Sequence, residues 1–170
     1  MAGFLGLLGA VFTVGFSCAV PLAAFAAIGE LSLGGAAAYA LISAIWLANQ
    51  LIGFIFLHYP LEPPAFAWGA ALYASGLLGT AAAQGARSIF GGTSTLAAPA
   101  TFFAAFAAYE GTLFIISVAA ASGTANFTAA IAGRVFFING AAFAALFLLR
   151  HAGRITGLVQ SAKYRAPLRR

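Results

Sequence analysis

Five strongly polar side chains stand inside long apolar stretches of this sequence. Asn49 and Gln50 occupy one stretch, Glu110 a second, and Arg134 and Asn139 a third. A charged or amide side chain at bilayer depth is costly, so such residues usually have a partner or a function. Their chemistry is that of binding, because amides donate and accept hydrogen bonds and the two charges attract ions or each other. We therefore treat these five positions as candidate site residues.

Glu110 and Arg134 stand on either side of a short neutral link that turns near Gly123. Glu110 comes thirteen residues before this glycine and Arg134 eleven residues after it. At about 1.5 Å per helical residue, the two side chains lie at similar depth in a helical hairpin. The spacing therefore predicts a buried ion pair, provided that the rotation of the two helices turns the side chains toward each other.

Asn49 and Gln50 fall in the same membrane layer as this pair under the orientation argued below. Polar groups from three helices then share one layer with aromatic residues that can form walls: Trp46, Trp68, Tyr73 and Tyr109. An apolar pocket with a few placed polar groups is the usual form of a ligand site. Two alternatives stay open: the polar groups tie the helices together, or they form an ion or proton path.

From the composition we expect neither a catalytic site nor a bound metal or cofactor. With three acidic residues in all, the chain offers no paired carboxylates for hydrolysis. The single cysteine, Cys18, excludes an internal disulfide and argues against a thiolate metal cage. His58 and His151 fall at opposite ends of the predicted spans, so one monomer cannot use both on one metal or haem. No nucleic-acid-binding module is recognisable.

These residues must be positioned by membrane helices. The chain has 170 residues, of which 63% are hydrophobic and 6% charged, with a mean hydropathy of +1.01. A soluble domain of this size could not cover such a composition, whereas a bilayer requires it. We predict an all-α polytopic transmembrane bundle, with one domain over residues 1–149. Its five spans cover residues 4–27, 36–57, 65–83, 97–121 and 128–149; a six-span alternative would split residues 4–27 or 89–121.

The basic residues predict the orientation. Most lie in a tail over residues 150–170: Arg150, Arg154, Lys163, Arg165, Arg169 and Arg170. Basic segments next to a span are typically cytoplasmic. Counting back five spans places the loop with Arg87 on the same side, and the loops with Glu62 and Asn126 outside. We therefore expect a bacterial-type inner-membrane protein with a cytoplasmic carboxyl terminus.

Small residues recur at every fourth position in three of the predicted spans. The longest series is Ala36, Ala40, Ala44 and Ala48; shorter ones are Gly15, Ala19, Ala23 and Ala27, and Ala100, Ala104 and Ala108. Small faces let helices approach closely in lipid. They serve either the packing of the bundle itself or the docking of a membrane-protein partner, for which the longest series is the candidate.

The alanine series and the predicted outer pocket together resemble the substrate-binding membrane subunits (S components) of energy-coupling-factor vitamin transporters. The resemblance implies a small helical bundle that captures a solute from outside and docks a transmembrane coupling subunit through an Ala-x-x-x-Ala face. That family usually has six spans with its docking face on the first, whereas this chain predicts five, with the longest series on the second. The string W-L-A-N-Q-L-I-G-F over residues 46–54, followed by Tyr59-Pro60 and Trp68-Gly69, has the look of a family signature.

We therefore expect a small-molecule binding or transport subunit that takes its solute into a pocket between spans two, four and five. Asn49, Gln50 and Asn139 would supply hydrogen bonds, and Trp46 and Tyr109 stacking area. Arg134 would meet an anionic group or be neutralised by Glu110. The alternative is an accessory or assembly subunit of a larger membrane complex, without a ligand. A membrane enzyme is the third and least favoured reading.

Overall fold

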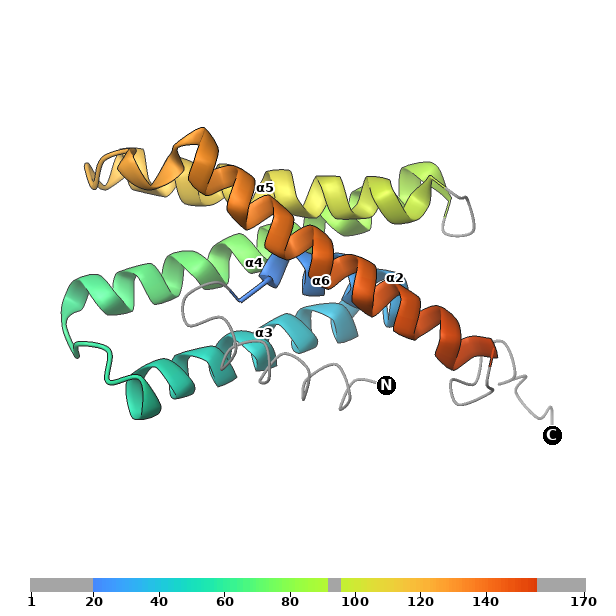
Figure 1. The fold of residues 1–170 in the computed structure, drawn as a ribbon, viewed down its shortest axis with the longest axis horizontal. Helices are drawn as coiled ribbons and strands as arrows, with labels where there is room; N and C mark the ends of the chain where they lie inside the picture. Colours follow the sequence, from blue (N-terminus) through green and yellow to red (C-terminus); the bar gives the residue numbers. More distant parts are fainter. Residues whose placement is uncertain (1–19, 92–95, 156–170) are drawn as a thin grey trace.

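The computed structural model describes residues 20–91 and 96–155, with side chains up to Gly153. All elements of this part of the chain are helical and none is a strand, which confirms the predicted α-helical bundle (Figure 1). The elements are α2 (Leu22–Ser32), α3 (Gly35–Leu51), a π-helical turn (Ile52–Phe56), α4 (Pro63–Phe90), α5 (Ala97–Ala119), a 3-10 turn (Ala125–Phe127) and α6 (Ala129–Ile155).

Four of the described helical segments are long and apolar enough to cross a membrane: Gly35–Phe56, Pro63–Phe90, Ala97–Ala119 and Ala129–Gly153. Their length and composition are those of an integral membrane protein. Helix α2 is different, because its 11 residues extend only about 16 Å and the hydrocarbon core is about 30 Å thick. The part of the predicted first span over residues 4–19, including Cys18, lies outside the described residues, as does the tail from residue 156.

The short helix α2 forms the core of the bundle. All residues from Leu22 to Leu31 are buried, and the helix packs against α3, α4, α5 and α6. In Figure 1, α6 crosses diagonally over α2, while α4 and α5 run side by side. Close packing depends on small residues: a Cβ added at Gly79 of α4 would lie 3.1 Å from the carbonyl oxygen of Ala105 on α5.

Two predicted connections are partly helical in the structure. The link expected over residues 29–35 is largely helix, because α2 continues past Glu30 to Ser32 and ends where Gly34 takes a φ of +71°. The loop expected over residues 84–95 is also helical up to Phe90, at the end of α4. Both predictions relied on a charge, Glu30 or Arg87, together with a run of glycines. The charge interrupts hydropathy without interrupting the helix, and each helix ends close to the glycines instead.

The small-residue series separate into two groups. Ala36, Ala40 and Ala44 are exposed on the outer surface of α3 and do not pack inside the described bundle, whereas Ala48 of the same series is half-buried. Ala23 and Ala27 are fully buried in α2, where they pack in the core, while Gly15 and Ala19 of the same series lie outside the described residues. The α5 series, Ala100, Ala104 and Ala108, is half-buried.

Candidate ligand-binding site

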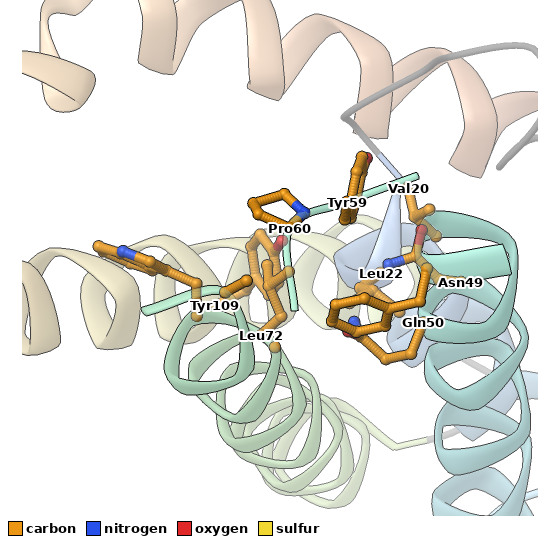
Figure 2. A pocket seen from close by; sticks show the side chains of 12 residues that line it. Val20, Leu22, Asn49, Gln50, Tyr59, Pro60, Leu72 and Tyr109 are labelled. Atoms are coloured by element: carbon orange, nitrogen blue, oxygen red, sulfur yellow. The ribbon is translucent and has the colours of Figure 1, made fainter. Parts of the chain in front are cut away.

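A cavity of about 330 Å³ lies at the amino end of α2, between α3, α4 and α5 (Figure 2). Its volume is at the lower end of the usual range for small-molecule sites. The lining residues come from four helices and from the connection between α3 and α4: Val20, Leu22, Asn49, Gln50, Phe54, Tyr59, Pro60, Ala65, Trp68, Gly69, Leu72 and Tyr109. None of the twelve is a charged residue or a histidine.

Trp68, which was predicted as an aromatic wall, lines this cavity, and so do three of the predicted site residues with polar groups: Asn49, Gln50 and Tyr109. Within the described part of the chain, none of these three side chains makes a hydrogen bond. For Asn49 and Gln50, which are half-buried, a solvent or ligand partner can complete the hydrogen bonding. Tyr109 is only 5% exposed as a residue, yet its hydroxyl is not one of the buried polar atoms that lack a partner, so the hydroxyl group remains accessible from the cavity.

Gly69 of α4 allows α3 to approach closely at the wall of the cavity. A Cβ added at this glycine would lie 2.8 Å from Oε1 of Gln50, so a larger residue would displace the amide. One helical turn earlier on α3, the indole N–H of Trp46 donates a hydrogen bond to the carbonyl oxygen of Gly69 at 2.8 Å. Trp46 and Gln50 therefore both contact Gly69 of α4. Because Gly69 has no side chain, the Gln50 amide can occupy the space beside it.

Behind this contact, polar and aromatic groups lock α3 to α4. The rings of Trp46 and Tyr73 lie 4.6 Å apart between centroids. The hydroxyl groups of Tyr73 and Ser43 are 2.9 Å apart, and Ser43 donates to the carbonyl oxygen of Tyr39 at 3.0 Å. Trp46 and Tyr73 were predicted to form walls of the pocket, but neither residue lines the cavity. Their contacts hold α3 and α4 together beside the cavity.

The π-helical turn Ile52–Phe56 carries the connection over the cavity. Gly53 lies under the ring of Tyr59, since an added Cβ would come within 2.7 Å of that ring. The N–H of Tyr59 also donates to the carbonyl oxygen of Gly53 at 3.1 Å, after His58 has taken a φ of +55°. Figure 2 shows Tyr59 and Pro60 on the same side of the cavity. Widened π turns are frequent at functional sites.

The other predicted site residues do not line the cavity. Glu110 is half-buried and Arg134 is exposed, and these two side chains form no ion pair in the described part of the chain. Their similar distance from the turn did not bring the two side chains together, because Arg134 lies at an exposed position on α6. The described cavity also involves no residue of α6, so it does not lie between spans two, four and five as predicted.

Asn139, on α6, has a structural partner instead. Its side-chain oxygen accepts a hydrogen bond from the backbone N–H of Ala24 at 3.1 Å, and its NH₂ group donates to the carbonyl oxygen of Val135 at 3.0 Å. Ala24 is in the first turn of α2, where helical N–H groups lack intrahelical acceptors. Asn139 therefore caps the short central helix from another helix.

The opposite end of α2 holds an ion pair between Glu30 and Arg87. This pair was not predicted from the sequence. Nη1 of Arg87 lies 2.9 Å from Oε1 of Glu30 and donates to the Glu30 carbonyl oxygen at 2.7 Å. From α6, Nη2 of Arg150 donates to the carbonyl oxygen of Leu31 at 2.6 Å. Two arginines thus satisfy carbonyls at the negative end of the helix dipole. The available signal was Glu30 itself, which lies close to a predicted span end.

No protein-family model matches this chain, and no curated protein or solved structure shows significant similarity to it. Function must therefore be argued from the cavity itself. Among the described residues, no three His, Cys, Asp or Glu side chains gather as a metal site would require. What the cavity offers is shape, aromatic surface and hydrogen bonding.

Proposed function

We propose that this chain is a membrane-embedded binding subunit for a small molecule, as part of a transport system. One observation carries the proposal: a cavity of about 330 Å³ in which the Tyr109 hydroxyl and the Asn49 and Gln50 amides have no protein partner among the described residues. Polar groups that serve only to join helices would be bonded to one another. Groups left open toward a cavity are suited to a ligand.

The arginines suggest the side from which the ligand enters. Arg87 and Arg150 both bind the carboxyl end of α2, so these two basic residues share one end of the bundle. The cavity lies at the amino end of the same helix. By the positive-inside rule the arginine end is cytoplasmic. The cavity then belongs to the outer half of a bacterial-type inner membrane, and the carboxyl terminus is cytoplasmic.

A transport role needs a partner, because the cavity itself offers no means of moving a solute. By analogy with the S components, a transmembrane coupling subunit would dock on the predicted face of Ala36, Ala40, Ala44 and Ala48, of which the first three are exposed. These three residues lie in a row on α3, whose side toward α4 holds Trp46 and Gln50. Helix α3 thus carries the exposed alanines on one side and cavity residues on the other, so it physically connects the cavity with a partner docked on the alanines.

Native mass spectrometry of the gently solubilised full chain tests the proposal. We expect a co-purifying small molecule whose occupancy falls in the double variant Asn49→Leu/Gln50→Leu. The control is Gln84→Leu, at an exposed position on α4 that does not line the cavity. A bound molecule that is equally retained by both variants, or a chain that is always empty, would contradict a ligand site at this cavity.

The exposed alanine row also supports a second candidate, an accessory subunit without a ligand. On this reading, the Ala36, Ala40 and Ala44 face is the functional surface and the cavity is incidental. The same measurement separates the two proposals. A stoichiometric protein partner with no small molecule favours the accessory subunit.

A further inference from the structure

We infer that the cavity takes an uncharged, planar ring compound that presents hydrogen-bond acceptors such as a carbonyl oxygen or a ring nitrogen. This inference rests on the proposed binding function and adds the chemical class of the ligand. It is carried by the charge, the open donors and the aromatic surface of the lining residues, which are considered in turn.

The lining charge selects against ions. None of the lining residues that the structure describes is Lys, Arg, His, Asp or Glu. The arginines Arg87 and Arg150 are engaged at the opposite end of α2. A buried ion without a partner is strongly disfavoured, so a carboxylate or phosphate would lack a counter-charge here. No carboxylate is among the described lining residues to meet a cation, which would also face the positive end of the α2 dipole. A neutral molecule meets neither penalty.

The open hydrogen-bonding groups favour acceptors on the ligand. Tyr109 is 95% buried, and its hydroxyl has no partner among the described residues. The amides of Asn49 and Gln50 add two further groups with N–H donors. The amino end of α2, represented by Val20 and Leu22 in the lining, adds a partial positive charge that favours electron-rich atoms. The hydroxyl, the two amides and the helix end can all stabilise a hydrogen-bond acceptor on an uncharged ligand.

Aromatic rings supply a third of the lining, and they favour a flat partner. Phe54, Tyr59, Trp68 and Tyr109 all line the cavity. Offset stacking and edge contacts with such rings add binding energy beyond the apolar area that is buried. A volume of about 330 Å³ accommodates one or two fused rings rather than a nucleotide or an acyl chain.

Three probes that share one bicyclic ring test this class in the full chain reconstituted in lipid nanodiscs: naphthalene carboxamide, naphthalene carboxylate and naphthylmethylammonium. Binding is followed by quenching of Trp68, which lines the cavity, and by thermal shift. We expect the carboxamide to bind at least about tenfold more tightly than either ion. Tyr109→Phe should weaken carboxamide binding about tenfold, the effect of one hydrogen bond, while the empty protein stays at least as stable.

A matched pair of glycine variants on α4 ties the binding to this cavity. Gly69→Ala displaces the Gln50 amide and should weaken carboxamide binding, whereas Gly85→Ala should not, because its added Cβ meets nothing within 4 Å. One of the two ions could bind as tightly as the carboxamide or more tightly, and respond in the same way to Tyr109→Phe and Gly69→Ala. That result would overturn the inferred ligand class but not the proposed binding function. Absence of binding by all three probes would overturn the inferred class, and an empty chain in native mass spectrometry would overturn the binding function as well.

Discussion

Asn139 accepts a hydrogen bond from the backbone N–H of Ala24 across 115 residues of sequence, and so caps the buried helix α2 from α6. Asn139 is only 2% exposed, so no solvent molecule can easily replace it. A helix within a bilayer cannot leave its terminal N–H groups open, because each unsatisfied group costs several kcal/mol. The asparagine is therefore part of what allows a helix of 11 residues to end inside the bundle.

We expect Asn139→Leu to lower the free energy of unfolding by about 1–2 kcal/mol, since a cap and a buried hydrogen bond are lost. Asn139→Asp should lose less, because it retains the acceptor and places negative charge near the amino end of α2. Thermal unfolding in detergent measures both. Asn126→Leu, at an exposed position in the 3-10 turn, is the control. Equal losses for Asn139→Leu and Asn126→Leu would show that the cap does not matter.

The ion pair between Glu30 and Arg87 should be a stabilising contact between α2 and α4. Glu30 has a side chain only 3% exposed, so Arg87→Gln leaves a buried carboxylate without this counter-ion. Breaking a buried pair typically costs 3–5 kcal/mol. We expect about 1–3 kcal/mol here, because the Arg87 side chain is 36% exposed and partly screened by solvent.

The double variant Glu30→Gln/Arg87→Gln should recover part of this loss, since it removes the uncompensated charge. Arg134→Gln is the matched control, an exposed arginine on α6 with no ion pair among the described residues. A thermal-denaturation cycle over the four Glu30 and Arg87 combinations measures the coupling. If Arg87→Gln and Arg134→Gln had the same small effect, the pair would not contribute to stability.

Gly79→Ala should destabilise the interface of α4 and α5, because the added Cβ would lie 3.1 Å from the carbonyl oxygen of Ala105. Backbone cannot move aside as a flexible side chain can, so we expect a loss of about 1–3 kcal/mol. Gly85→Ala, on the same helix and in open space, should instead be neutral or slightly stabilising, by up to about 1 kcal/mol. Comparing the unfolding midpoints of the two variants measures the difference, and similar midpoints would contradict close packing at Gly79.

Trp46→Phe removes the indole N–H that donates to Gly69 and keeps an aromatic ring beside Tyr73. We expect a loss of about 1 kcal/mol of stability. Binding at the cavity should weaken too, because Gln50 is positioned on the same glycine. Trp68, the second tryptophan, remains as the fluorescent reporter for both measurements. Weakened stability with unchanged binding would limit Trp46 to a structural role.

Ala40→Leu tests the exposed face of α3 without disturbing the bundle. The residue is exposed, so we expect the unfolding midpoint of the isolated chain to change little. A partner that docks on this face should be lost, because a larger side chain keeps the helices apart. Co-purification from the native membrane, compared with wild type and with Ala81→Leu at an exposed position of α4, measures it. Retention of the partner by Ala40→Leu would place the docking surface elsewhere.

The class of the molecule followed from the sequence, because long uncharged stretches have few other stable environments than a bilayer. Sequence also pointed to much of the site. In the string from Trp46 to Gly69 that we singled out, Asn49, Gln50, Tyr59 and Trp68 line the cavity. These residues share a short segment of chain, so the close spacing of two neighbouring helices was sufficient to bring them together.

Contacts between distant segments were decided only by the tertiary structure. The predicted pair of Glu110 with Arg134 is replaced by Glu30 with Arg87, which are 57 residues apart. Counting residues yields depth along a helix, but it does not yield the rotation of a helix or the choice of neighbours. Asn139 shows the same limit, because its role as a cap depends on α6 crossing the start of α2. The sequence determined which polar residues need partners, and the packing of the helices determined which partners they have.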